Sequence, residues 1–321
     1  MNWLSFYTKT YSALRSSSGV PYWVLTPLRK LTRLGANKML PCILAKHRER
    51  KGVVERGVIV SFTSFPARIG DVWQVVKSLK NQSVLPEKII LWLSLEQFPD
   101  KLGIPESLLK EVDDLFEIRM VEGDIRSHKK FYYVMNEYPD KSFITCDDDI
   151  YYHPDTLRYL VEGSKKFPNC VIANTARYVQ HNEAGELLPY NSWKVVRKSY
   201  ETTDLIQTGV GGVLYPPHVL HDMTLMKEIF TTLTPMADDL WLNSMARLKG
   251  TPIVKSGLEL LPLPIKNGSD SLSSINVGLS KNDEQLQAMR SWLSDSLFDP
   301  YISGYHVSFK GCDTSEIGGN S

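Results

Sequence analysis

Three consecutive carboxylates are the part of this sequence best suited to chemistry. Asp147, Asp148 and Asp149 follow directly on the apolar run 143–146, FITC. Adjacent like charges raise one another's pKa, so they require a compensating cation. Mg2+ and Mn2+ prefer such hard oxygen ligands and complete their coordination with water and phosphate. Because alternate residues of an extended chain point the same way, Asp147 and Asp149 are predicted to address one metal ion. Asp148 is then expected to contact a sugar hydroxyl or a backbone amide.

A second pair of carboxylates, Asp238 and Asp239, opens a segment that is predicted to be a helix ending near Gly250. One aspartate at a helix start caps backbone amides and suits the helix dipole. Two adjacent aspartates exceed what one cap needs. A carboxylate placed here can serve as a general base, which contributes ~10²–10⁴-fold to a reaction. The dipole is expected to keep it ionised at neutral pH.

The segments that lead to the acidic triplet alternate between strand-like and helix-like patterns. Strands are predicted over 57–63, 88–95, 117–122 and 142–146, and helices over 71–82, 105–114 and 128–138. This alternation predicts an α/β chain with a doubly wound, mostly parallel, Rossmann-like sheet and helices on both of its faces. Such sheets bind ligands at the carboxyl ends of their strands, which is where the triplet lies.

The run 146–152, CDDDIYY, resembles the DXD element of glycosyltransferases with the GT-A fold, which holds a divalent metal against the diphosphate of a nucleotide sugar. The run 58–68, VIVSFTSFPAR, resembles the first strand and nucleotide-contacting loop of bacterial polysaccharide glycosyltransferases. With the segments 78–83 and 88–94, the resemblance covers roughly residues 57–250. It implies a family 2-like, metal-dependent enzyme of surface polysaccharide synthesis. The donor would be a nucleoside-diphosphate sugar, with a UDP-sugar favoured, and the acceptor a glycan or a lipid-linked oligosaccharide.

The same resemblance implies roles for individual residues. The cofactor would be a divalent metal, Mn2+ or Mg2+, bound by Asp147, Asp149 and a C-terminal histidine, His306. In inverting enzymes of this type the second acid of a pair is the base, which assigns Asp239 that role with Asp238 beside it. The family usually has glutamate at the position of Asp238, so the choice between the two aspartates stays open. The residues expected to contact the donor are Thr63, Ser64, Arg68, Arg126, Lys129, Asp148, Gly211 and Gly212.

The lysine contact and a possible acceptor platform also have open alternatives. Lys129 is favoured over Lys130 as the phosphate contact, although either lysine could simply be a solvated residue at a helix start. Aromatic faces stack on sugar rings, so three residues are candidates for an acceptor platform: Tyr178, Tyr190 and Trp193. Ordinary core packing explains each of these aromatic residues equally well.

Four interpretations of the function stay open. An inverting glycosyltransferase is the first, and a retaining glycosyltransferase on the same fold is the second. A sugar-nucleotide nucleotidyltransferase, the third, uses the same carboxylates and metal. It should carry a loop rich in glycine, lysine and arginine after the first strand, where this chain has TSFPAR at 63–68. A non-catalytic sugar-binding module is the fourth.

The composition of the chain excludes several other classes of protein. The 321 residues carry a formal net charge of +1, which gives no electrostatic basis for binding nucleic acid. The four cysteines form no CxxC pair and no disulfide framework, as expected of a reducing compartment. No apolar run reaches the ~20 residues that span a bilayer, and no secretory signal is visible. The expected location is therefore cytoplasmic.

The N-terminus differs from the rest of the chain. Residues 1–48 contain eight Lys and Arg residues, six aromatic residues and no Asp or Glu. Helical spacing is visible over 1–18, and a second short helix is predicted from Thr26 to near Gly35. A basic amphipathic segment of this kind is typical of peripheral membrane contact, here on the cytoplasmic face of the inner membrane. The alternative is a helical arm packed on the body or on a second subunit.

These observations divide the chain into three parts. Residues 1–52 are the basic N-terminal segment, and 53–311 are the GT-A domain. Within that domain 53–152 are expected to bind the nucleotide and 153–311 the acceptor. Residues 312–321 are predicted to be a flexible tail.

Overall fold

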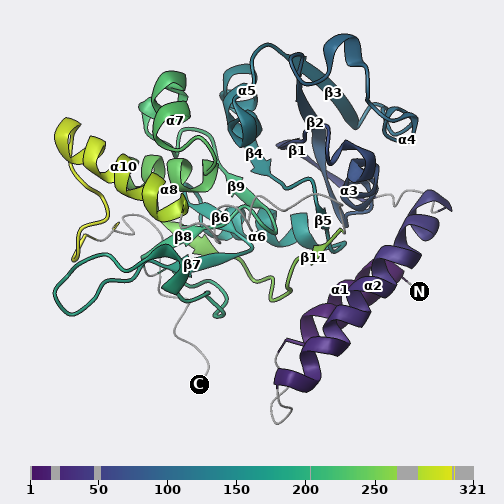
Figure 1. Cartoon of the computed structure of the whole chain (residues 1–321), viewed down its shortest axis with the longest axis horizontal. Helices are drawn as coiled ribbons and strands as arrows, with labels where there is room; N and C mark the ends of the chain where they lie inside the picture. The colour runs from purple at the N-terminus through teal and green to yellow at the C-terminus, as the bar shows by residue number, and fades with distance from the viewer. Residues whose placement is uncertain are drawn as a thin grey trace.

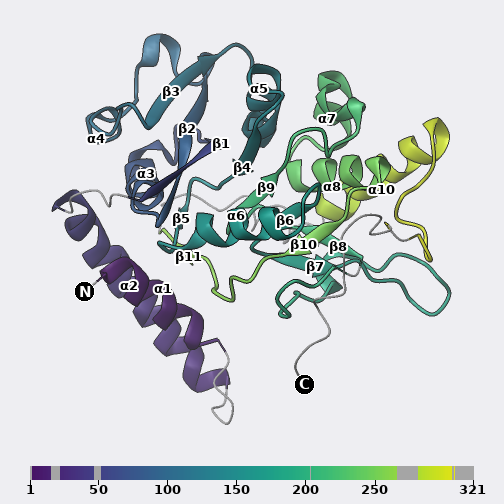
Figure 2. The same ribbon diagram turned by 180° about the vertical axis from the view of Figure 1, so that it is seen from behind.

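A computed structural model describes residues 2–15, 22–46, 52–202, 204–265, 281–305 and 307. Within them the chain forms a central sheet of seven strands with helices against both faces (Figure 1). Two N-terminal helices lie along one side of this body (Figure 2). The α/β class and the mostly parallel sheet predicted from the sequence are confirmed.

The strands of the central sheet follow one another in space in the order β10-β6-β9-β4-β1-β2-β3. Their bounds are β1 (Val53–Thr63), β2 (Val84–Ser94), β3 (Phe116–Val121), β4 (Ser142–Thr145), β6 (Val171–Ala173), β9 (Val213–Tyr215) and β10 (Ile253–Lys255). Neighbouring strands are parallel, except that β9 runs antiparallel to β4 and to β6. The carboxyl ends of β1 and β4 therefore meet at the edge of the sheet where β9 begins.

Both faces of the sheet are covered, which explains the near-continuous apolar character of its strands. Along β1, Val60 and Phe62 pack into one core and Ile59 into the other. The first core contains α3 (Val72–Lys80) and α6 (Thr156–Lys166), and the second contains α5 (Lys129–Glu137) and α8 (Asp238–Lys249). These two packed layers hold the ends of β1 and β4 in place.

The remaining elements complete the described chain. The helices are α1 (Trp3–Ala13), α2 (Tyr22–Lys46), α4 (Glu106–Leu109), α7 (Lys227–Leu233) and α10 (Lys281–Ser296). The short 3-10 turns are η1 (Ile69–Asp71), η2 (Pro99–Lys101), η3 (Arg126–His128), η4 (Tyr190–Ser192) and η5 (Asp222–Leu225). Two small antiparallel ladders pair β5 (Ile150–Tyr151) with β11 (Leu263–Pro264) and β7 (Ala176–Tyr178) with β8 (Leu205–Gln207).

Two helix predictions are wrong in extent. The helix expected over 105–114 is limited to α4, because the side chain of Asp113 accepts hydrogen bonds from the backbone amides of Leu115 and Phe116 and turns the chain into β3. The helix expected from Thr26 to near Gly35 instead runs as α2 from Tyr22 to Lys46, with Pro27 inside it. Tertiary packing overrides the glycine there, since three later residues of the helix enter the core: Ala36, Leu40 and Leu44.

Candidate functional site

The acidic triplet forms the turn between β4 and β5. The amide of Cys146 donates to the carbonyl of Ser61 at 3.2 Å, which keeps β4 beside β1 up to the start of the turn. The amide of Asp147 then donates to the hydroxyl of Tyr152 at 2.6 Å and closes the turn. The triplet thus lies at the carboxyl end of a central strand, as the sequence predicted.

Asp148 has partners other than those expected from the sequence. Its Oδ2 accepts a hydrogen bond from Ser64 Oγ at 2.6 Å, and its Oδ1 accepts one from Arg68 Nη1 at 2.8 Å. The Arg68 and Asp148 side chains are only 5% and 8% exposed. Asp148 therefore ties the triplet to the loop after β1. In that loop the hydroxyl of Thr63 donates to the carbonyl of Trp92 at 2.7 Å, so the polar groups expected to contact a nucleotide are bonded within the protein.

Asp147 and Asp149 are the more accessible members of the triplet, with side chains 24% and 22% exposed. Arg68 Nη1 lies 3.0 Å from Asp149 Oδ2, and Lys130 Nζ lies 2.5 Å from Asp147 Oδ1. Burial, reinforced by the charge of Asp147, raises the pKa of Asp149 to about 6. The arginine opposes this rise without cancelling it.

Lys130, rather than Lys129, is the lysine that reaches the acidic groups. Lys129 is buried and paired with Asp124. Lys130 Nζ contacts Asp147 and lies 3.9 Å from Asp238 Oδ2, so it bridges the two acidic clusters. Burial alone would lower the pKa of Lys130, but the surrounding carboxylates outweigh burial and hold that pKa well above the ordinary value. The sequence analysis favoured Lys129 for this position, and the structure places Lys130 there instead.

The second pair of carboxylates lies at the start of α8, which ends before Gly250 as predicted. Asp239 Oδ2 accepts a hydrogen bond from the amide of Gly209 at 2.8 Å. Burial, followed by the charge of Asp238, raises the pKa of Asp239 to about 8, even though Lys130 and the Gly209 amide lower it. The expectation that the helix dipole keeps this carboxylate ionised at neutral pH is therefore corrected, because desolvation is the larger effect.

Gly209 is a residue that the sequence analysis did not single out. A Cβ atom at this position would lie 3.1 Å from Asp239 Oδ1 and 3.6 Å from Asp147 Oδ1. The two acidic clusters therefore flank the same point of the backbone, and the absence of a side chain there keeps them close.

Gly211 and Gly212 serve internal packing. Both adopt positive φ, +100° and +95°, which favours glycine. A Cβ atom on Gly211 would lie 3.1 Å from Thr175 Oγ1, and one on Gly212 would lie 3.3 Å from Leu160 Cδ1. The close contacts at these two glycines are thus with the protein's own side chains.

Five carboxylates in this region share two cations, Arg68 and Lys130. Burial, reinforced by the charges of neighbouring carboxylates, raises the pKa values of Asp149 and Asp239. The chemistry of these donors, clustered hard oxygens with excess negative charge, fits a divalent cation. No group of three or more His, Cys, Asp and Glu side chains is arranged to hold a metal within the described ranges. His306 lies outside the described residues.

The remaining predicted contact residues include Arg126 and the aromatic residues Tyr190 and Trp193. Arg126 is exposed at the start of η3 and contacts Met236. Tyr190 and Trp193 are 7% and 1% exposed, and the indole of Trp193 donates to the carbonyl of Leu188. These two aromatic residues pack in the second core, as the alternative interpretation held, and present no open face to an acceptor.

Comparisons with known proteins identify no family for this chain. No family model matches the sequence, and no curated protein matches it. Among solved structures, HddC from Yersinia pseudotuberculosis, complexed with GMP-PN, aligns with 52% of this chain and 78% of its own at 15% identity and a TM-score of 0.33. An apo UDP-glucose pyrophosphorylase aligns with 76% of this chain and 100% of its own at 10% identity and a TM-score of 0.38. UDP-glucose pyrophosphorylase complexed with UDP-glucose aligns at 11% identity and a TM-score of 0.37.

Proposed function

We propose that this chain is a metal-dependent, inverting glycosyltransferase. It transfers a sugar from a nucleoside-diphosphate sugar, with a UDP-sugar favoured, to a hydroxyl group of a glycan or a lipid-linked acceptor. The observation that carries the proposal is the meeting of two acidic clusters around Gly209. One cluster ends a central strand and suits a cation that accompanies a diphosphate. The other supplies a partly buried carboxylate that suits a general base.

Asp147 and Asp149 are the residues that would hold the cation, Mn2+ or Mg2+. Their ion pairs with Lys130 and Arg68 each engage one oxygen of the carboxylate. A divalent cation, when bound, stabilises the negative charge of the departing nucleoside diphosphate. Asp148 would position its neighbours through its bonds to the loop after β1, and the two cations would add positive charge next to the diphosphate.

Asp239 would carry out the proton transfer. A sugar hydroxyl is a poor nucleophile until its proton is removed, and the Asp239 carboxylate would accept that proton. The acceptor oxygen then forms a bond to the anomeric carbon, while the bond from that carbon to the diphosphate oxygen breaks. A base with a pKa near the working pH is well suited to this step, and the pKa of Asp239 is about 8. Lys130, by lowering that pKa, would favour the ionised form that the step requires.

Nucleotidyl transfer between a nucleoside triphosphate and a sugar phosphate is the second candidate. It also depends on carboxylates and a divalent cation, and carboxylates on both sides of Gly209 would suit a site with two cations. The loop at 63–68, without glycine, favours glycosyl transfer. The two reactions differ in the bond that breaks. Glycosyl transfer breaks the bond from the anomeric carbon to oxygen, and nucleotidyl transfer breaks the phosphoanhydride P–O bond between the α- and β-phosphates of the nucleoside triphosphate.

The products therefore separate these functions. The chain is incubated with a panel of nucleotide sugars and Mn2+, with and without pyrophosphate, and the nucleotides are identified by chromatography and mass spectrometry. Glycosyl transfer, or its hydrolytic side reaction, predicts a nucleoside diphosphate that forms without pyrophosphate. A nucleoside triphosphate and a sugar 1-phosphate, formed only with pyrophosphate, would instead identify a nucleotidyltransferase. Binding of the donor without either product would identify a sugar-binding module.

A further inference from the structure

The helices α1 and α2 pack side by side and against the catalytic body, and together they are called the N-terminal hairpin here (Figures 1 and 2). Gly35 of α2 lies against the ring of Tyr7 of α1, where a Cβ atom would be 3.6 Å from the ring. One side of the hairpin enters the first core of the body through Leu4, Ala36 and Leu40. The hairpin thus has a well-packed inner face.

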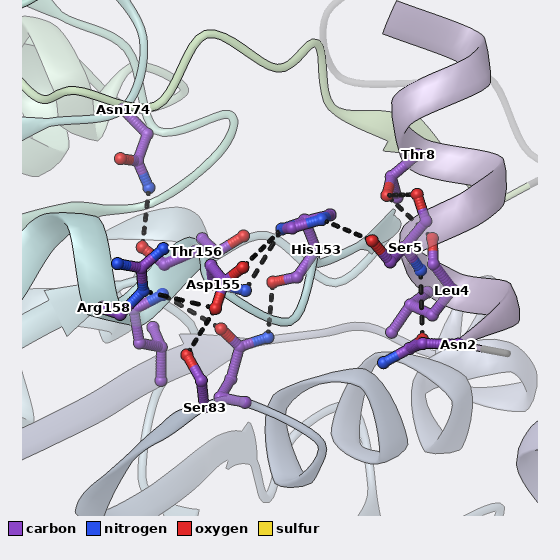
Figure 3. Close-up of polar contacts among 12 residues, drawn as sticks. Asn2, Leu4, Ser5, Thr8, Ser83, His153, Asp155, Thr156, Arg158 and Asn174 are labelled. Atoms are coloured by element: carbon purple, nitrogen blue, oxygen red, sulfur yellow. Dashed lines mark hydrogen bonds and ion pairs between the residues drawn. The ribbon is translucent and has the colours of Figure 1, made fainter.

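Polar contacts fix the hairpin to the segment that follows β5, beside the start of β2. Ser5 Oγ lies 2.9 Å from His153 Nε2 (Figure 3). His153 Nδ1 accepts a hydrogen bond from the amide of Asp155, so Nε2 carries the proton and donates a hydrogen bond to Ser5 Oγ. The His153 carbonyl accepts from the side chain of Gln82 at 2.8 Å. Any surface that binds the hairpin is consequently held in a fixed position relative to the candidate site.

The outer face of the hairpin is apolar and has no partner within the described chain. Trp23 is 76% exposed and Leu31 62%. The exposed large apolar residues of the hairpin are Trp3, Phe6, Trp23, Leu28, Leu31, Leu34 and Met39. Isolated exposed apolar residues are ordinary, but such a concentration on two helices indicates an interaction surface.

The charge of the hairpin identifies the kind of surface that it fits. Residues 1–48 contain eight Lys and Arg residues and no acidic residue, whereas the whole chain is nearly neutral. Lys30, Lys38 and Lys46 of α2 are exposed together with the apolar residues. Interfacial membrane helices combine lysines with aromatic and leucine side chains in this way, and tryptophan favours the headgroup region. No helix among the described residues is long and apolar enough to cross a membrane.

We propose that the N-terminal hairpin docks this chain on an anionic lipid bilayer. The helices lie in the plane of the interface, the apolar outer face enters the headgroup region, and the lysines contact lipid phosphates. Docking would bring the whole chain to the surface that carries a lipid-linked acceptor. The docking itself is independent of the proposed catalytic function.

Vesicle binding by the full chain tests this proposal. We expect the chain to sediment with vesicles of phosphatidylcholine and phosphatidylserine at least tenfold more strongly than with phosphatidylcholine alone, and salt to weaken this binding. Replacing Lys30, Lys38 and Lys46 with glutamine should reduce the affinity on the order of a hundredfold, because each basic residue contributes ~1 kcal/mol near an anionic surface. The matched control replaces exposed lysines of the body: Lys101, Lys110 and Lys165.

The apolar contribution has its own pair of variants. The change of Leu28, Leu31 and Leu34 to serine should weaken vesicle binding at least tenfold, whereas Leu102→Ser with Leu109→Ser, which are exposed on the body, should leave it unchanged. The fluorescence of Trp23 should shift to shorter wavelength on binding, and Trp23→Phe should remove most of that shift. Circular dichroism establishes that each variant is folded.

Three outcomes would overturn the proposal. The first is binding by the intact chain that does not depend on anionic lipid. The second is an equal loss of binding in the control variants. The third is a dimer, seen by light scattering, that the Leu28, Leu31 and Leu34 variant converts to monomer while vesicle binding is unaffected. That result would identify a second copy of the chain as the partner of the hairpin.

Discussion

The three adjacent aspartates of the acidic turn differ in what they contact, and this difference assigns them different roles. Asp148 is buried against Ser64 and Arg68, whereas Asp147 and Asp149 are partly exposed. The raised pKa of Asp149 means that the folded protein disfavours its ionised form. A neutral residue is therefore better tolerated at 149 than at 148.

The stabilities of the triplet variants should reflect this difference. Asp148→Asn should lower the free energy of unfolding by about 3 kcal/mol, because it removes one partner of a buried ion pair. Asp149→Asn should change it by less than about 1 kcal/mol and should weaken Mn2+ binding instead. Urea unfolding at pH 7 measures the first effect and calorimetric titration the second. Equal stabilities of the two variants would contradict the structural role of Asp148.

The raised pKa values also predict proton release when the metal binds. At pH 7.5 the Asp239 carboxyl, with a pKa of about 8, is largely protonated in the metal-free protein. A cation bound at Asp147 favours the ionised form of Asp239 and so drives the proton off. Titration with Mn2+ in buffers of different ionisation enthalpy should therefore give different heats. Asp239→Asn should bind Mn2+ with heats that depend much less on the buffer, and wild-type heats that do not depend on the buffer would refute the coupling.

The contact between η3 and α7 contains a histidine that should make the fold sensitive to acid. His128 is fully buried, and its Nε2 bonds to the carbonyl of Thr234 at 2.7 Å. Within the described chain Nδ1 has no hydrogen-bond partner. Burial lowers the pKa of His128 to about 4, and the charge of Lys130 acts in the same direction. The unfolded chain thus binds a proton below pH 6.5 that the folded chain binds only near pH 4.

The lowered pKa of His128 makes the folded protein less stable in acid. Because the pKa is lower in the folded state, stability is fully present above pH 6.5 and is lost as the pH falls from 6.5 toward 4, by up to about 3 kcal/mol. His128→Gln keeps a donor for Thr234 and should flatten this part of the stability curve. Urea unfolding between pH 7.5 and 4.5 measures the slope, with His218→Gln as a control at an exposed position. An unchanged slope in His128→Gln would refute the assignment.

Substitutions in the glycine-rich loop before β9 should affect turnover and stability separately. Gly209 has no positive φ, so an alanine there fits the backbone but presses on Asp239 and Asp147. Gly209→Ala should reduce turnover at least tenfold with little change in stability. Gly212→Ala introduces a side chain at a φ of +95°, which costs about 1–3 kcal/mol. Turnover and unfolding of both variants provide the test, and a Gly209→Ala enzyme with normal turnover would contradict the proximity of the two acidic clusters.

The sequence predicted those elements whose signals are local. The apolar runs of β1, β2 and β4 mark buried strands, and the aspartates at 238 and 239 mark the start of α8. What it missed depends on tertiary contacts. The orientation of Lys130 depends on the register of α5 against β1, which the bond from Ser61 Oγ to the Lys130 carbonyl fixes. Likewise, the proximity of Gly209 to both acidic clusters can be recognised only from the position of β9 between β4 and β6.

At the scale of the whole molecule, one antiparallel strand creates the candidate site. The strands β6, β9 and β10 belong to the predicted acceptor half, 153–311, yet they continue the sheet begun by the nucleotide half, 53–152. Because β9 runs against β4, the loop that precedes β9 reaches the carboxyl end of β4, where the triplet lies. The carboxylate of Asp239 accepts a hydrogen bond from the amide of Gly209. It therefore lies beside the same glycine as the carboxylate of Asp147. The hairpin adds a surface outside this sheet and is attached to it through the contact between Ser5 and His153.

The anomeric configuration of the product shows whether Asp239 is the base of an inverting sugar transfer. NMR follows the anomeric configuration of the transferred sugar during metal-dependent turnover by the wild type, by Asp239→Asn and by the control Asp222→Asn, whose side chain is exposed. We expect inversion in the wild type and in the control. Asp239→Asn should bind the donor normally and turn over ~10²-fold or more slowly, since only the proton transfer is lost. Retention of configuration, or normal turnover by Asp239→Asn, would show that Asp239 is not the base of an inverting transfer.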